Sequence, residues 1–192
     1  NPVGPCDSVS DDMILTINPA ATSNAGIDQT ICSNGSVELN GSFGGGATSA
    51  TWRSTGTGSF DDSTSASAVY TPSAADSAAG TVRLIYTTND PDGIGPCLAA
   101  KDTMILTISP AATVYAGADQ TICSNSTVTL AGSFGGGATS AKWRTSGDGT
   151  FSDSTSTSAV YTPGTGDKST GTVTLTLITN NPAGPCDSVS DD

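Results

Sequence analysis

The chain has 192 residues, a length that suits two small β-domains of about 100 residues each. It is poor in charged residues (12%) and rich in Gly, Ser and Thr, a composition that favours short strands and turns over amphipathic helices. The net charge is −12 and the six Lys and Arg residues are scattered, which argues against nucleic acid as a partner. Every apolar run is shorter than the roughly 18 to 20 residues that span a bilayer, so direct membrane insertion is not expected.

The first residues of the chain return at its end. Residues 1–12 (NPVGPCDSVSDD) reappear as residues 181–192 (NPAGPCDSVSDD), but only the first copy is followed by MILTI, at 13–17. We therefore expect an excised interior piece of a longer array, in which residues 1–18 supply the C-terminal strand of a preceding repeat.

One module follows twice, at an offset of 91 positions. Residues 13–17 (MILTI), 29–34 (QTICSN) and 41–50 (GSFGGGATSA) recur as residues 104–108, 120–125 and 132–141. This register predicts a first module, residues 19–109, and a second module, residues 110–192, that lacks its last strand.

Within each module, apolar residues alternate with polar ones. In the first module they are Val37 and Leu39, then Val82, Leu84 and Tyr86, then Met104, Leu106 and Ile108. A period of two predicts half-buried strands, and Gly- and Asn-rich turns between them give about seven strands per module. Trp52 and Trp143 fall in the predicted third strand, where an indole fills the space between two sheets. The predicted fold class is all-β, with tandem β-sandwich modules.

Residues 25–32 (AGIDQTIC) and 116–123 (AGADQTIC), each followed by Val-x-Leu-x-Gly, resemble the PKD-like and immunoglobulin-like repeats of giant Bacteroidota cell-surface adhesins. The resemblance covers essentially the whole chain. It implies tandem immunoglobulin-like (PKD-like) β-sandwich repeats in an extended array. It also implies type IX secretion, a link in some members to gliding motility, and an extracellular or cell-surface location.

Five cysteines in an exported chain suggest disulfides, and two pairings are open. The first pairing forms disulfides within each module, joining Cys32 to Cys97 and Cys123 to Cys186, and leaves Cys6 unpaired. The other follows from strand parity, because five antiparallel strands between Cys32 and Cys97 would place these residues at opposite poles, on the order of 20 to 30 Å apart. A disulfide spans only about 4.4 to 6.8 Å between Cα atoms. In a head-to-tail stack Cys32 would instead reach Cys186 of the next module.

We expect no catalytic residues. The sequence has no histidine, which excludes Ser-His-Asp and Cys-His nucleophiles and imidazole metal sites. The GGG segments at 44–46 and 135–137 lack the Lys-Ser/Thr of a phosphate-binding loop and are predicted as turns. Asp61 and Asp62 would point to opposite faces of a strand, and the second module has Ser152 and Asp153 there, which argues against a glycosidase pair.

Calcium is the one cofactor that the sequence leaves open, because this hard cation prefers carboxylate ligands. The candidates are Asp28, Asp61, Asp62, Asp90, Asp92 and Asp119. We favour the alternative that they are solvated turn residues, since no EF-hand or nonapeptide calcium pattern surrounds them.

Several Asp-Ser and Asp-Thr pairs resemble the O-glycosylation motif of Bacteroidota, and their acceptor residues are Ser8, Ser63, Ser77, Thr103, Ser154 and Ser188. The alternative is that Ser and Thr are simply abundant in this chain. Attached sugar would shield strand edges.

These features predict a structural stalk or filament segment of a secreted or surface-anchored bacterial repeat adhesin. Its partners would be neighbouring repeats of the same chain and other copies in a filament. The alternative is a multivalent module that binds polysaccharide or solid surfaces, with Ile85 or Tyr115 as contacts. A remote alternative is an accessory domain of a surface enzyme.

Overall fold

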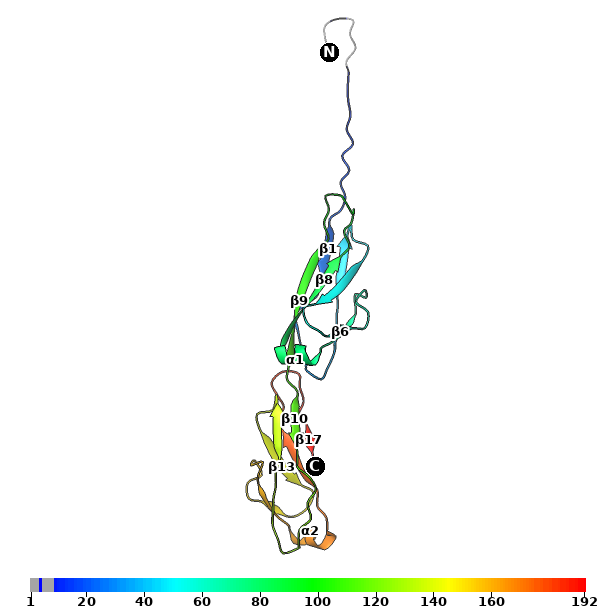
Figure 1. The fold of residues 1–192 in the computed structure, drawn as a ribbon. Coiled ribbons are helices and arrows are strands. Elements are labelled where there is room, and N and C mark those ends of the chain that lie inside the picture. Colours follow the sequence, from blue (N-terminus) through cyan, green and yellow to red (C-terminus); the bar gives the residue numbers. More distant parts are fainter. Residues whose placement is uncertain (1–3, 5–8) are drawn as a thin grey trace.

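The structure is a computed structural model that describes Gly4 and residues 9–192. Two modules are stacked end to end, and residues 9–18 project from the far end of the resulting rod (Figure 1). Each module has its own cluster of buried side chains, one drawn from residues 25–108 and the other from residues 130–177.

The first module is built from short strands and one helix. They are β1 (Ala21–Asn24), β2 (Gln29–Cys32), β3 (Val37–Glu38), β4 (Ser42–Gly45), β5 (Ala50–Ser54), β6 (Ser59–Phe60), β7 (Val69–Thr71), α1 (Ala74–Ala79), β8 (Thr81–Thr88) and β9 (Lys101–Ser109). One sheet has the order β2-β9-β8-β5, a second has the order β3-β7-β6, and β1 pairs with β4. Side chains of both larger sheets, such as Tyr70 and Leu106, meet in one core, which makes the module a β-sandwich.

The apolar residues that alternate with polar ones in the sequence are the buried residues of the strands. Residues Val82, Leu84 and Tyr86 of β8 are buried, and so are Met104, Leu106 and Ile108 of β9. The residues between them on β9 are exposed. The period-two prediction is therefore confirmed, and Trp52 and Trp143, each 2% exposed, are core residues as predicted.

The seven predicted strands appear as nine segments because two of them change sheets. Gly26, with φ of 84°, separates β1 from β2, so that β1 pairs with β4 while β2 runs parallel to β9. Likewise β3 pairs with β7, whereas β4 pairs with β1. At this second crossing a Cβ on Gly41 would lie 2.8 Å from the Trp52 ring, so only glycine lets the strand pass the indole.

Helix α1 was not predicted from the sequence. Ser73 is its N-cap and forms a capping box with Asp76, and Gly80 ends the helix in the left-handed conformation. The motif Ser73-x-x-Asp76 followed by Gly80 was the available signal. It was missed because a six-residue helix shows too little periodicity to compete with the surrounding strand pattern.

The second module repeats this layout with one difference. Its elements are β10 (Ala112–Tyr115), β11 (Val128–Thr129), β12 (Ser133–Gly136), β13 (Ala141–Thr145), β14 (Thr150–Phe151), β15 (Val160–Thr162), α2 (Thr165–Thr170), β16 (Leu175–Thr179) and β17 (Ser190–Asp191). The sheet orders are β13-β16-β17 and β11-β15-β14, with β10 paired to β12. Residues 120–123, the counterpart of β2, form no strand, and the full-length counterpart of β9 is replaced by the two residues of β17.

Residues 9–20 contain no strand, although residues 13–17 have the sequence of the buried part of β9. A lone strand leaves its backbone groups unpaired and is not stable in water. The side chains of this segment are accordingly exposed, with Met13 at 82%, Leu15 at 72% and Ile17 at 83%.

Candidate functional site

The distinctive chemical feature of the molecule lies where the two modules meet. A disulfide joins Cys32, at the end of β2, to Cys186, in the loop before β17, with the Cα atoms 5.1 Å apart. The Cys186 sulfur lies 3.5 Å from the carbonyl oxygen of Ser109, which is the register partner of Cys32 on β9. The disulfide therefore ties the last residues of β2 and β9 to the top of the second module.

The connection beside the disulfide is short. Only Pro110 and Ala111 separate β9 from β10. Ser33 binds both sides of this connection, donating its N–H to Ser109 at 2.8 Å and accepting the N–H of Ala111 on its side chain at 3.0 Å. Pro110, the disulfide and these hydrogen bonds together leave few free dihedral angles at the junction.

The pairings within modules are wrong. Cys186 is bonded to Cys32, and both Cys97 and Cys123 are free thiols in the described part of the chain. Cys6 lies outside the described residues. The reason is the parity argument: β2 ends at the pole that faces the second module, whereas Cys97 lies near Asn18 at the other pole, with its sulfur 3.7 Å from the Asn18 carbonyl oxygen.

Each module also has a buried carboxylate at one end of the sandwich. Asp76 accepts hydrogen bonds from the N–H groups of Thr57 and Gly58 at 2.9 and 2.8 Å and from the Tyr70 hydroxyl at 2.8 Å. Burial opposes ionisation of Asp76, but these donors and the N–H of Ser73 outweigh it and lower its pKa from 3.8 to about 2. The carboxylate thus organises a loop and is not poised for acid–base chemistry.

The second module repeats this arrangement with Asp167. Its carboxylate accepts the Tyr161 hydroxyl at 2.7 Å and the N–H of Gly164 at 3.0 Å. The hydrogen bond from Tyr161 is the main cause of a lowered pKa for Asp167. Sequence reasoning missed both residues, because an Asp near a short helix gives no sign of its partners across the fold.

The calcium candidates are dispersed over the molecule. Five of them cap backbone N–H groups: Asp28 that of Ile105 at 2.8 Å, Asp61 that of Val69 at 2.7 Å, Asp62 that of Thr64 at 2.9 Å, Asp90 that of Gly93 at 3.1 Å and Asp92 that of Cys97 at 3.2 Å. Asp119 is exposed. Among residues 9–192, no three Asp, Glu, His or Cys side chains come together as metal ligands would.

The glycosylation candidates differ in accessibility. Thr103 and Ser188 are exposed, whereas Ser63, Ser77 and Ser154 are half-buried. Ser77 lies inside α1, where its hydroxyl donates to the Ser73 carbonyl at 3.0 Å. Ser8 lies outside the described residues. Among the described candidates, Thr103 and Ser188 are thus the most accessible to an attached sugar.

One aromatic residue is exposed at the same position of both modules. Phe43 on β4 is 40% exposed, and its counterpart Phe134 on β12 is 36% exposed. Tyr115, 54% exposed, is the register partner of Ser133, next to Phe134. Ile85, the other predicted contact, is half-buried on β8.

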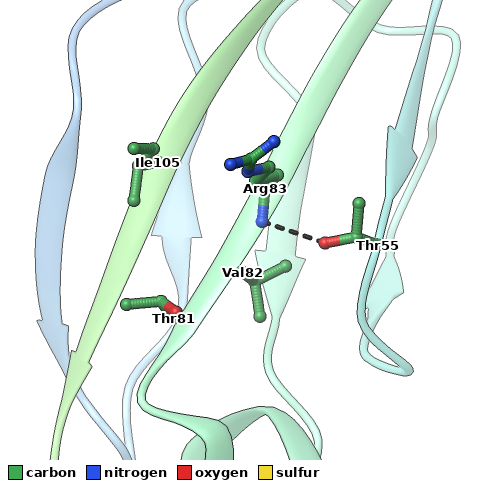
Figure 2. A pocket seen from close by; sticks show the side chains of 5 residues that line it. All are labelled: Thr55, Thr81, Val82, Arg83 and Ile105. Atoms are coloured by element: carbon green, nitrogen blue, oxygen red, sulfur yellow. Dashed lines mark hydrogen bonds between the residues drawn. The ribbon is translucent and has the colours of Figure 1, made fainter.

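A shallow hollow lies on the first module between β8, β9 and the loop after β5. Figure 2 shows its lining, which is Thr55, Thr81, Val82, Arg83 and Ile105. The backbone N–H of Arg83 donates to the Thr55 hydroxyl at 3.1 Å, the dashed line of Figure 2. Arg83 is the only charged residue of this lining, so the hollow contains no carboxylate to act as a general base.

No family model matches the chain, and no curated protein matches it. Among solved structures, the insect immune protein hemolin superposes with a TM-score of 0.53 and 13% identity, over 94% of this chain and 47% of hemolin. The fold is a tandem of immunoglobulin-like β-sandwiches.

Two cadherin structures are also similar. Mouse cadherin-23 EC22–24 aligns with a TM-score of 0.47 and 10% identity over 91% of this chain and 64% of that chain. Human CDH23 EC21–23 aligns with a TM-score of 0.49 and 12% identity over 91% and 62%. The chain spans less than two thirds of the length of each of the three proteins. In the part of the chain that the structure describes, no helix is long and apolar enough to cross a membrane.

Proposed function

We propose that this chain is a load-bearing stalk segment of an extracellular repeat protein, of the secreted or surface-anchored kind that its sequence resembles among Bacteroidota adhesins. The observation that carries the proposal is the disulfide between Cys32 and Cys186, which joins one module to the next. A disulfide also suits an oxidising, extracellular compartment. That its aspartates are turn residues rather than calcium ligands stays a prediction for this stalk.

The position of the disulfide along the chain gives it a mechanical consequence. Its two cysteines are 154 positions apart, so most of both modules lies inside one covalent loop. Force applied to the two ends passes from Cys32 through the sulfurs to Cys186. Even if the modules unfold, the enclosed residues add no length to the stalk.

Pulling on single molecules tests this function. The oxidised chain is stretched from its termini and compared with the double variant Cys32→Ser, Cys186→Ser. Unfolding of the variant releases the 154-position loop, which at about 3.6 Å per residue adds roughly 550 Å of extension that the oxidised chain does not show.

The matched control is Cys97→Ser, Cys123→Ser, which removes the free thiols and keeps the disulfide. It is expected to extend like the unmodified chain. If the oxidised chain extends as far as the Cys32→Ser, Cys186→Ser variant, the disulfide carries no load and the proposed stalk function is wrong.

A second candidate function is multivalent adhesion to polysaccharide or solid surfaces, and the repeated exposure of Phe43 and Phe134 favours it. An aromatic face presented once per module gains avidity with every added module. The test is binding of the oxidised chain to a panel of polysaccharides. The double variant Phe43→Ala, Phe134→Ala should abolish saturable binding, whereas Ile27→Ala, at another exposed position, should leave it unchanged.

A further inference from the structure

The positively charged residues are scattered along the sequence but gathered in the fold. The chain has six Lys and Arg residues against 18 Asp and Glu residues. Five of the six are exposed residues of strands β5, β8, β9 and β13, namely Arg53, Arg83, Lys101, Lys142 and Arg144. The sixth, Lys168, lies on α2. Strands β5, β8 and β9 belong to one sheet of the first module, and β13 belongs to the equivalent sheet of the second.

Strand alternation places the three cations of the first module on the outer face of this sheet. Arg53 follows the buried Trp52, and Arg83 lies between two buried residues of β8. Lys101 is in step with the exposed residues of β9. Because successive side chains of a strand point to opposite faces, all three cations point away from the core. We call this outer surface of the sheet β2-β9-β8-β5 the cationic face.

The register of the strands places one cation in each of three successive rows across the cationic face. Taken across β5 and its end, β8 and β9, the rows are Thr51-Thr87-Lys101, Arg53-Ile85-Thr103 and Thr55-Arg83-Ile105. Successive rows are two residues apart along each strand, or about 7 Å. The cation lies on β9 in the first row, on β5 in the second and on β8 in the third. The positive charges are therefore spread over the face, each with neutral neighbours in its own row.

The carboxylates of this sheet are directed elsewhere. Asp102 is the one acidic residue within strands β2, β5, β8 and β9, all of which the structure describes. It has the inward parity of β9 and accepts the N–H of the buried Ala25 at 2.8 Å. Asp28 borders the face beyond β9, where its carboxylate accepts the N–H of Ile105 at 2.8 Å. The cationic face is thus a positive surface on a chain whose net charge is −12.

Between its cations the face presents threonine hydroxyls and two isoleucines. Figure 2 shows Arg83 on β8 next to Ile105 on β9, at the hollow whose lining also includes Thr55 and Thr81. A sugar ring has hydroxyl groups at its edge and C–H groups on its faces. Threonine hydroxyls can donate to and accept from the sugar hydroxyls, and Ile105, which is 40% exposed, can cover the C–H groups.

We propose that the cationic face binds an anionic polysaccharide, whose carboxylate or sulfate groups pair with its three cations while sugar hydroxyls bond to its threonines. Arg53 and Arg83 suit this ligand because a guanidinium pairs with a carboxylate through two parallel N–H donors. The proposal deepens the adhesive alternative described above and rests on it, but it uses a different surface from that of Phe43 and Phe134.

The second module offers the same kind of ligand a further contact. Lys142 and Arg144 are exposed on β13, on either side of the buried Trp143, so both point to the outer face of their sheet. Arg144 is the counterpart of Arg53, and Lys142 is the counterpart of Thr51. A polysaccharide long enough to reach both modules would gain affinity from the second contact.

A second copy of this chain matches the cationic face less well. The other sheet of the first module has Glu38 on β3, and Asp61 and Asp62 follow β6. Both aspartates already accept N–H groups of their own loop, Asp61 that of Val69 at 2.7 Å and Asp62 that of Thr64 at 2.9 Å. An anionic polysaccharide instead presents carboxylates or sulfates that are free to pair.

Nucleic acid also matches the face less well. The aromatic residues of strands β2, β5, β8 and β9 are Trp52 and Tyr86. Both are buried in the core, so the cationic face has no ring on which bases would stack.

The test measures equilibrium binding of the oxidised 192-residue chain to immobilised polysaccharides by surface plasmon resonance. Polygalacturonate supplies carboxylates, dextran sulfate supplies sulfates, and dextran is neutral. We expect saturable binding to at least one of the two anionic polysaccharides, weakening as sodium chloride is raised, and none to dextran. The chain is prepared without attached sugar, because Thr103 lies on the cationic face.

Two substitutions that change the net charge equally separate a local site from a general effect of charge. Arg83→Gln should weaken binding about two- to fivefold, the loss expected for one exposed ion pair. Lys168→Gln, on α2, should leave binding unchanged. Thr51→Lys, which copies Lys142 of the second module, adds a cation to the face and should strengthen binding by a similar factor. All three positions are exposed, so the melting temperatures should stay equal.

The triple variant Arg53→Gln, Arg83→Gln, Lys101→Gln should lose about tenfold or more in affinity. If this variant keeps its binding to the anionic polysaccharides while Phe43→Ala, Phe134→Ala abolishes it, the adhesive function stands and the cationic face is not its site. If the chain binds none of the three polysaccharides, the adhesive function and the present proposal are both wrong.

Three further outcomes would overturn the proposal and identify what the face does instead. Equal weakening by Arg83→Gln and Lys168→Gln would mean that binding depends on net charge alone. Equal affinity for single-stranded DNA at the same salt concentration would mean that the face accepts any polyanion. Self-association in sedimentation velocity that the triple variant abolishes, without binding to polysaccharide, would identify a second copy of the chain as the partner.

Discussion

At the scale of single residues, Asp76 and Asp167 have the largest structural consequence. Each is nearly buried, at 3% and 6% exposed, and each gathers the N–H groups of a loop together with a tyrosine hydroxyl. The cost of burying a charge is offset because charged acceptors form the stronger hydrogen bonds. Replacing such an acceptor leaves its donors buried without a partner.

We predict that Asp76→Asn lowers the free energy of unfolding of the first module by about 2 to 3 kcal/mol at neutral pH, because the amide cannot accept from every donor of the carboxylate. Urea unfolding followed by the fluorescence of Trp52, in a Trp143→Phe background, measures the change. Asp167→Asn is the matched control and should affect the second module only. Equal destabilisation of both modules by either substitution would contradict this account.

The lowered pKa of Asp76, about 2 against the ordinary 3.8, also predicts a pH dependence. A group whose pKa is depressed by folding stabilises the fold above the ordinary value and loses that stabilisation as the pH falls toward the folded value. Between pH 4 and pH 2 the first module should therefore lose about 2 kcal/mol through this residue. The Asp76→Asn variant should show a correspondingly smaller loss over the same interval.

The calcium candidates belong to the same scale. Because five of the six cap backbone N–H groups within the fold, we expect a chelator to leave the melting temperature unchanged. Differential scanning calorimetry with EDTA and with added calcium tests this expectation. A rise in melting temperature on adding calcium would instead favour a cation site.

At the scale of elements, the second module is a sandwich with one strand missing, and the loss extends to both neighbours. Residues 120–123 and 172–174 form no strand, although Thr174 still accepts the N–H of Ser146 at 3.0 Å, whereas the corresponding β2 and the start of β8 are paired with β9. Local stability follows such pairing, since an unpaired amide exchanges with water freely.

Hydrogen exchange of the 192-residue chain should therefore distinguish equivalent segments of the two modules. We predict fast exchange at residues 120–123 and 172–173 and protection at residues 29–32 and 81–83. A synthetic peptide with the sequence of residues 13–18 should restore protection to the second module. Equal protection of the two modules before the peptide is added would contradict this account.

At the scale of the whole molecule, the junction fixes the shape of the rod, and the net charge governs how copies interact. The two modules form a rod that is held at its single junction by Cys32, Cys186 and Ser33 (Figure 1). Each copy has a net charge of −12, so copies repel one another unless salt screens them.

The sequence by itself determined the repeat, the strands of each module and the buried indoles of Trp52 and Trp143. These are consequences of local pattern, since a copied module preserves its register and a period of two marks one buried face. The tertiary structure decided which cysteines meet, because that depends on the pole at which each strand ends. It also decided which aspartates are structural, through partners such as Tyr70 and Tyr161 that only packing brings near.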